Sequence, residues 1–178
     1  TCTMPAAKNK PEKKNVTPLH NALLNNQPFE IIQLLVEHAQ KHLSIEEFKE
    51  FINAQMSNSS TALSIAVTQK QKEIIKFLLK NGSDIELTEA MPASNGNLKK
   101  KNITALHAAL LANQPFEIIQ LLVEHAKKHL PKEKFNKFIN AQTNHGSTAL
   151  SIAVTQKQKE TIKCLLKNSA NPNIQNND

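Results

Sequence analysis

The sequence predicts an all-α solenoid in which pairs of helices stack side by side, and three observations lead to this fold class. The segment that begins at Asn15 returns almost unchanged at Asn102, so the chain contains one unit twice. Apolar residues recur at the three- and four-residue spacing of amphipathic helices. A weaker repeat lies inside each unit, because short related motifs begin at Thr17, Thr61, Thr104 and Thr148.

The duplication fixes the expected organisation of the chain. Residues 15–81 and 102–168 differ at 16 of 67 aligned positions, which leaves 51 identical. The four motifs are 44, 43 and 44 residues apart, so each unit holds two repeats. We expect a disordered basic tail at 1–14, a first repeat at 15–57, a second at 58–88, a loop between the units at 89–101, a third repeat at 102–144, and a fourth repeat with a C-terminal tail at 145–178.

Each repeat is expected to hold a short helix followed by a longer one. Pro28 ends a run of amide residues, and its fixed φ suits the first turn of the second helix. An extra short helix is expected in the first and third repeats, where Ser44 and Glu47 have capping-box spacing and Pro131 suits a first helical position. Its apolar face is expected to pack into the core through Phe48, Phe51, Ile52, Phe135, Phe138 and Ile139.

The repeated motifs resemble the ankyrin repeat family. The resemblance rests on TPLHNA at 17–22, on the I-I-x-x-L-L pattern of the second helices, and on the repeat endings at 81–85 and 168–173. It covers about residues 15–174 and implies an ankyrin-type α-solenoid, with the extra helix as a departure from the usual repeat length of about 33 residues.

The resemblance also implies roles for single residues. His20 and His107 are expected to hydrogen-bond neighbouring backbone and tie repeats together. Lys70 and Lys157 stand at a turn that the family fills with Gly, so we expect another backbone conformation there. Asn53, Asn140 and Asn173 match an asparagine that asparaginyl hydroxylases modify in some ankyrin proteins, although a hydrogen bond to its own turn is the favoured role.

A non-catalytic module that binds another protein is the predicted function. In ankyrin-like stacks the hairpin tips and the first helices share a concave side, where variable polar residues select the partner. A monomer that recognises an acidic or polar protein surface is expected. The candidate partner-binding residues are Lys13, Lys14, Asn21, Asn25, Asn58, Ser59, Thr68, Gln69, Lys100, Lys101, Asn113, His145, Thr155 and Gln156.

The sequence predicts no catalytic residue, no cofactor and no metal site. His38 with His42, and His125 with His129, have the spacing of a two-histidine metal clamp. Solvated helix ends are the favoured interpretation, because the zinc-protease motif HExxH is not met. Cys164 lies on the apolar face of a predicted helix and is expected to be a buried, unreactive thiol.

Charge suggests an alternative function. The 22 basic residues are all Lys and the net charge is +7, so a basic module docking on nucleic acid or an anionic membrane through Lys13, Lys14 and residues 99–101 is the alternative. The lack of Arg makes nucleic acid the less favoured partner, since Arg provides most specific base contacts. No apolar stretch approaches the length of a transmembrane helix.

Localisation and context follow from weaker signals. Two cysteines without a pairing pattern favour a reducing, cytoplasmic compartment. The composition also resembles that of proteins that intracellular bacteria deliver into host cells, so the targeting domain of a secreted effector is a further alternative. Apolar residues such as Ile31 near the start and Leu166 near the end predict that neighbouring segments of a larger protein cover the outer repeats.

Overall fold

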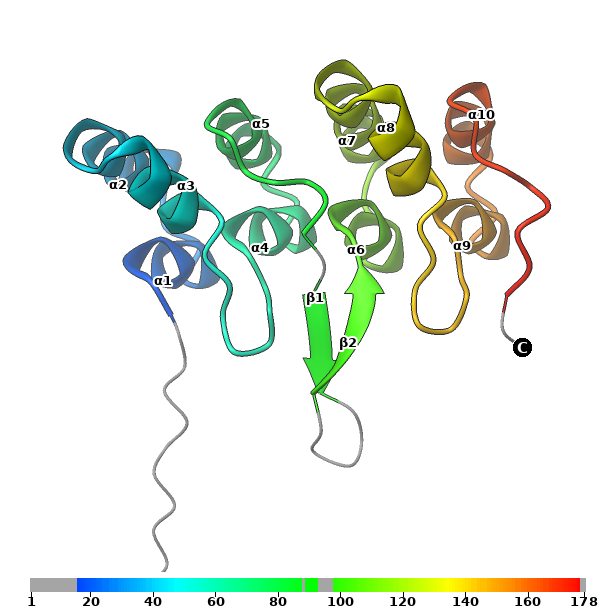
Figure 1. Cartoon of the computed structure of the whole chain (residues 1–178), viewed down its shortest axis with the longest axis horizontal. Coiled ribbons are helices and arrows are strands. Elements are labelled where there is room, and N and C mark those ends of the chain that lie inside the picture. The colour runs from blue at the N-terminus through cyan, green and yellow to red at the C-terminus, as the bar shows by residue number, and fades with distance from the viewer. Residues whose placement is uncertain (1–15, 88, 93–97, 177–178) are drawn as a thin grey trace, which may run out of the picture.

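The chain folds into four layers of helices placed side by side (Figure 1). The computed structural model describes residues 16–87, 89–92 and 98–176, so the tail predicted at 1–14 lies outside the described residues. Within this part the layers are α1 (Pro18–Leu24), α2 (Phe29–His42) and α3 (Ile45–Ile52); α4 (Ala62–Thr68) and α5 (Lys72–Lys80); α6 (Ala105–Leu111), α7 (Phe116–His129) and α8 (Lys132–Ile139); and α9 (Ala149–Thr155) and α10 (Lys159–Lys167). The predicted all-α solenoid, with extra helices in the first and third repeats, is confirmed.

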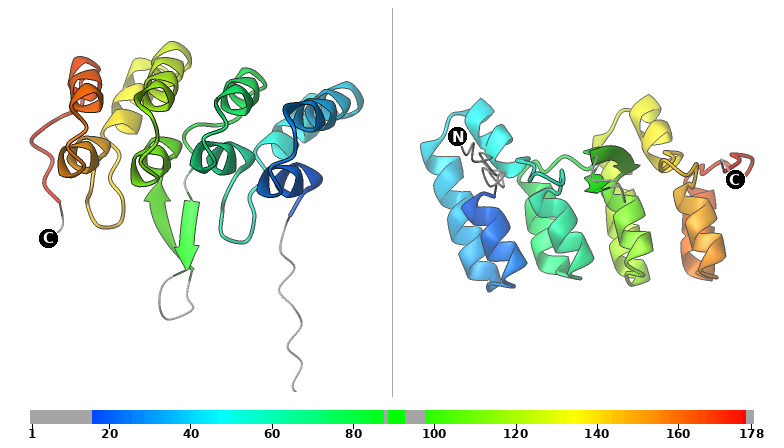
Figure 2. Two further views of the ribbon diagram at one scale, coloured as in Figure 1. Left: turned by 180° about the vertical axis from the view of Figure 1, so that it is seen from behind. Right: turned by 90° about the horizontal axis from the view of Figure 1, so that it is seen from below.

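The first helices of the layers form one row and the second helices another. Figure 2 shows α1, α4, α6 and α9 side by side, with α2, α5, α7 and α10 forming the row behind them. The extra helices α3 and α8 pack against α2 and α7. Leucines of the first helices are buried between the two rows, at Leu19, Leu63, Leu106 and Leu150.

A threonine caps each first helix, which explains the repeated motif. The side chains of Thr17, Thr61, Thr104 and Thr148 accept a hydrogen bond from the backbone N–H three residues later. The side chain of that third residue, a His or a Ser, accepts a hydrogen bond from the threonine N–H in return. Two donors that the helix leaves unpaired are thereby satisfied in each layer.

The extra helices begin as predicted in one copy and one residue later in the other. Ser44 and Glu47 form the expected capping box of α3, with the Glu47 carboxylate accepting from the Ser44 N–H at 2.9 Å. Pro131 caps α8 from the position before its first residue, and Pro28 does the same for α2. Both prolines therefore lie outside the first helical turn, where their missing N–H still costs nothing.

The turns between first and second helices use the left-handed conformation. Asn26, Lys70, Asn113 and Lys157 have φ values of 50°, 62°, 49° and 57°. The expectation of a different backbone path at Lys70 and Lys157 is wrong. The lysines accept the strain that Gly would avoid, because the same turn must join the helices in every layer.

The aromatic side chains of the extra helices pack against the core. Phe135 and Phe138 are buried, and Phe48 and Phe51 are half-buried against the same core cluster. The prediction that these phenylalanines are structural is confirmed.

A β-hairpin links the two units. β1 (Glu89–Pro92) pairs antiparallel with β2 (Leu98–Ile103), and Glu89 lies opposite Ile103. The loop predicted at 89–101 is wrong for these strand residues, because their backbone groups pair with each other. The hairpin projects to the same side of the stack as the loops before α4 and α9 (Figure 1).

Candidate protein-binding surface

One face of the stack combines the first helices with the hairpin loops that precede them. We call this surface the inner-helix face and define it by α1, α4, α6 and α9 with the loops at 55–60 and 142–147 (Figure 2). The last residue of each first helix lies seven positions after the capping threonine. These four residues, which we call the helix-end row, are Leu24, Thr68, Leu111 and Thr155, and all four are exposed.

The helix-end row alternates between two kinds of side chain. Leu24 is 46% exposed and Leu111 53% exposed, although both are leucines. The Thr68 hydroxyl donates to the Ile65 carbonyl at 2.9 Å, and the Thr155 hydroxyl donates to the Ser151 carbonyl at 3.0 Å. These bonds hold the hydroxyls against their helices, and each oxygen keeps lone pairs that can accept from a ligand.

Sequence reasoning found the threonines of this row and missed the leucines. The sequence predicts Thr68 and Thr155 because polar side chains usually provide specificity, whereas Leu24 and Leu111 match the pattern of buried leucines. Counting seven residues from each capping threonine would have found all four, since equivalent residues of stacked repeats share one environment.

Two of the predicted amide residues, Gln156 and Asn113, hydrogen-bond across a boundary between layers. The Gln156 side chain donates to the Leu110 carbonyl at 2.9 Å, across the boundary between the third and fourth layers. Asn113 accepts from the Gln158 side chain at 2.8 Å in the same boundary. Gln69, which is equivalent to Gln156, is half-buried. The bonds of Gln156 and Asn113 contribute to stacking, and this use leaves the two side chains less free to meet a partner.

Asn21 lies at the open end of the stack and does not belong to the helix-end row. Its counterparts Ile65, Ala108 and Ile152 are buried, and Ile152 is buried although no described layer follows it. The position is therefore covered by the preceding layer, which the first repeat lacks within the described residues. Asn25, at the end of α1, is exposed and donates to the Asn21 carbonyl at 2.8 Å.

The hairpin loops place further predicted residues on the inner-helix face. Asn58 and His145 are exposed, and Ser59 is half-buried with a φ of 61°. The Asn58 side chain accepts from the Ser60 N–H at 3.1 Å, which shapes its loop. Lys100 and Lys101 belong to β2, and Lys13 and Lys14 lie outside the described residues.

The two buried histidines hydrogen-bond neighbouring backbone, as predicted, in the segment that leads from their own repeat to the next one. The His20 Nδ1 accepts from the Thr17 N–H, so Nε2 carries the hydrogen and donates to the Ala54 carbonyl at 3.1 Å. His107 repeats this arrangement with Thr104 and with the Ala141 carbonyl at 3.1 Å. Burial lowers the pKa of His20, and it lowers the pKa of His107 to about 4. Neutral imidazoles with both nitrogens occupied act as structural links.

Two asparagines form a second link between layers. The Asn53 side chain accepts from the Asp84 N–H at 2.7 Å and donates to the Gly82 carbonyl at 3.2 Å. Asn140 makes the equivalent bonds to Asn171 and Ser169, at 2.7 and 3.4 Å. Their amides thus bond the next layer rather than only their own turn, and hydroxylation of these residues stays a prediction.

The geometry of the paired histidines and of Cys164 bears on metal binding and on thiol reactivity, and it favours neither. The rings of His38 and His42 lie 4.3 Å apart and those of His125 and His129 4.1 Å apart. In the part of the chain that the structure describes, no three His, Cys, Asp or Glu side chains gather as a metal site. Cys164 is half-buried, and burial raises the pKa of its thiol, which disfavours the reactive thiolate.

Capped helix pairs joined by hairpin loops and stacked in one direction define a helix-pair repeat protein that presents one continuous face. A family model of ankyrin repeats, in three copies, matches residues 3–89 and again residues 89–176. The chain therefore belongs to the ankyrin repeat family. Ankyrin repeats are a general protein-protein interaction module, and the family is typically non-catalytic.

Several curated proteins are similar to this chain over most of its length. An ankyrin repeat protein of Acanthamoeba polyphaga mimivirus is 28% identical over 147 residues, which cover 82% of this chain and 16% of that protein. An alpha-latrotoxin of Latrodectus geometricus is 27% identical over 125 residues, covering 70% and 8%. The human transient receptor potential cation channel subfamily A member 1 is 32% identical over 114 residues, covering 64% and 8%. The chain spans only 16%, 8% and 8% of these three relatives.

Among the described residues, no helix combines the length and the hydrophobicity that crossing a bilayer requires.

Proposed function

We propose that the inner-helix face binds a segment of another protein through the helix-end row and through the hairpin loops at the opposite ends of the first helices. The observation that carries this proposal is the alternation of exposed leucine and threonine along the row, in all four layers. Two exposed leucines at equivalent positions offer apolar anchor points, while the threonines, Asn58 and His145 offer hydrogen bonds. A partner segment with spaced apolar residues among polar or acidic ones would suit this pattern.

The stacked scaffold supports the proposed mechanism. The link from His107 to Ala141 and the link from Asn53 to Asp84 hold the loops and helices of neighbouring layers in fixed positions. A preformed surface lowers the ordering cost of association, so a modest contact area gives useful affinity. Binding of this kind needs neither a catalytic residue nor a cofactor.

The proposal extends to the context of the chain. We infer an interaction module within a longer protein, because the matched relatives are several times longer than the region they share with this chain. A cytoplasmic location, including the inside of a host cell after secretion, is part of the same proposal, and the unpaired Cys164 is compatible with it.

Binding of random peptides displayed on phage tests the proposal. Peptides selected on the wild-type chain should bind at least about tenfold more weakly to the variant Leu24→Asp/Leu111→Asp, because the anchor points become charged. Ile45→Asp is the matched control: Ile45 is 85% exposed, begins α3 and lies outside the inner-helix face, so affinity should not change. Equal binding by all three chains would contradict the proposal.

Salt dependence separates the proposed function from the basic docking alternative. A polar and apolar contact with a peptide should weaken only modestly as salt rises, since few ion pairs form. Binding to nucleic acid or to anionic vesicles that falls steeply with salt, without any peptide selected on the inner-helix face, would favour the alternative.

A further inference from the structure

The boundary between the two units shows how one repeat face covers another. At this boundary α4 packs against α6 and α5 packs against α7. Val67 and Leu79 on one side, and Ile118 on the other, are buried at 0%, 4% and 2% exposure. The Gln114 side chain crosses the boundary and donates to the Thr68 carbonyl at 3.1 Å. This boundary, which we call the central junction, is an apolar contact with one defined hydrogen bond.

The duplication places the same two faces at the ends of the stack, where no layer among the described residues covers them. Val154 and Leu166, the counterparts of Val67 and Leu79, are 54% and 46% exposed on α9 and α10. Ile31, the counterpart of Ile118, is 41% exposed on α2. Because these residues have identical counterparts in the other unit, the neighbouring layer alone accounts for their burial at the central junction.

A groove marks the open face of the fourth layer. It encloses about 390 Å³ and is lined by Leu150, Val154, Ile162, Leu166, Pro172 and Ile174 among others. We call this surface the C-terminal face. The opposite surface, the N-terminal face, carries Gln27, Ile31 and Leu34, and all three side chains are exposed.

We propose that the C-terminal face of one copy of this chain stacks on the N-terminal face of a second copy, in the geometry of the central junction. A second copy of the chain fits these faces, because their duplicates already pack against each other at the central junction. Val154 and Leu166 would cover Ile31 as Val67 and Leu79 cover Ile118. Gln27 would donate to the Thr155 carbonyl, as Gln114 does to Thr68.

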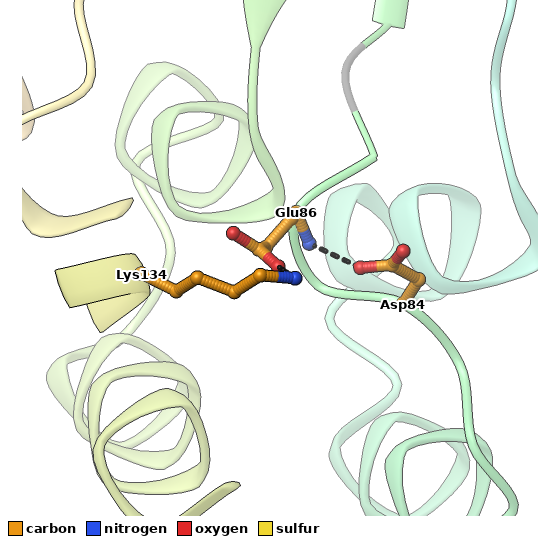
Figure 3. A network of polar contacts seen from close by, with 3 residues as sticks. All are labelled: Asp84, Glu86 and Lys134. Atoms are coloured by element: carbon orange, nitrogen blue, oxygen red, sulfur yellow. Dashed lines mark hydrogen bonds and ion pairs between the residues drawn. The ribbon is translucent and has the colours of Figure 1, made fainter. Parts of the chain in front are cut away.

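Three substitutions make this contact weaker than the central junction. Asn21 replaces Ala108, so a polar amide would be buried in the contact, at a cost unless it finds a partner. Figure 3 shows the ion pair that borders the central junction, with the Lys134 ammonium 3.4 Å from the Glu86 carboxylate. Glu47 and Asn173 stand at these two positions in the end faces, so that ion pair is lost without creating a repulsion.

The proposed contact uses different surfaces on the two copies. Such a head-to-tail contact does not close, so association should continue beyond a dimer as concentration rises. The monomer expected from the sequence would then be the dilute form of the chain. The contact includes the outer sides of α1 and α9 and the Thr155 carbonyl, but no side chain of the helix-end row, so either proposal can fail without the other.

Sedimentation equilibrium over a range of concentrations tests the proposal. The wild type is compared with two variants, each of which carries one added charge on one of the two faces. The wild-type mass should rise with concentration and pass the dimer mass. Ile31→Glu on the N-terminal face, and Leu166→Glu on the C-terminal face, should each stay monomeric. Both residues are substantially exposed, so the folded monomer should tolerate these charges, and circular dichroism would verify that it does.

Mixing the two variants gives the sharpest result. Ile31→Glu retains an open C-terminal face and Leu166→Glu retains an open N-terminal face, so an equimolar mixture should form a dimer and nothing larger. Ile45→Glu, at a residue of α3 that is 85% exposed and belongs to neither end face, is the matched control and should associate like the wild type. Asn21→Ala restores the residue of the central junction and should strengthen association severalfold, with an unchanged circular dichroism spectrum.

Several outcomes would overturn the proposal. A wild-type chain that stays monomeric at the highest attainable concentration excludes it. A mixture that remains monomeric, while the wild type forms only dimers, would indicate a symmetric contact instead. A chain that associates only after removal of residues 1–15 would assign the N-terminal face to that segment.

Discussion

At the scale of single residues, Lys70 carries a strain that a substitution can remove. Its φ of 62° lies in the left-handed region, which costs a residue with a Cβ roughly 1–2 kcal/mol. Gly adopts this conformation freely but gains freedom in the unfolded chain, worth roughly 0.5–1 kcal/mol. Lys70→Gly should therefore raise the free energy of unfolding by about 0.5–1 kcal/mol, as measured by urea denaturation.

The controls for this substitution come from the same turn and from the helix that follows it. Lys70→Ala keeps the strain and should not stabilise the chain. Lys76→Gly, in the middle of α5, should destabilise by about 1 kcal/mol, because Gly is unfavourable within a helix. Equal effects of Gly at the two positions would show that the left-handed turn stores no strain.

His107 predicts a dependence of stability on pH. Burial lowers its pKa in the folded chain to about 4, below the ordinary value of 6.5 that applies after unfolding. Between pH 6.5 and pH 4 the unfolded chain binds a proton that the folded chain does not. The stabilising contribution of the neutral His107 is therefore fully present above pH 6.5 and is lost as the pH falls toward 4. The difference between the two pKa values corresponds to about 3 kcal/mol of the free energy of unfolding.

Unfolding by urea at several pH values measures this contribution. The wild type should lose about 3 kcal/mol more than His107→Gln between pH 6.5 and pH 4, because glutamine does not titrate. An identical acid sensitivity in His107→Gln would contradict the assignment.

At the scale of elements, local signals predicted the helices, while the site and the hairpin depend on neighbours. The Ser44–Glu47 capping box and the phenylalanine spacing located α3 and α8, since both signals act within one helix. The pairing of β1 with β2 has no such signal, because the lysine-rich β2 lacks the alternation of apolar and polar residues that predicts a strand.

The candidate surface was predicted in part for a related reason. Polarity selected Thr68 and Thr155 correctly as exposed residues, but exposure in a stack depends on the spacing of layers as well as on residue type. The same dependence explains why Leu24 is exposed, why Gln156 is used between layers, and why Asn21 lies at an open end.

At the scale of the whole molecule, stability is expected to be the sum of layer and boundary contributions. Among the described residues, the main contacts of each layer are with its neighbours along the sequence, as in other repeat proteins. The central junction is the boundary that couples the two units, because the main helix contacts between them, α4 with α6 and α5 with α7, lie there. Weakening it should separate the unfolding of the units while leaving each unit's own helices intact.

Ile118→Glu tests this coupling. Ile118 is 2% exposed at the central junction, and a carboxylate placed there would be desolvated against Val67 and Leu79. We expect the single urea transition of the wild type to divide into two, with hydrogen exchange assigning one transition to each unit. Ile31→Glu is the matched control, because it makes the same change at the equivalent, exposed position and should preserve a single transition. A single, cooperative transition in Ile118→Glu would show that coupling between the units does not pass through the central junction.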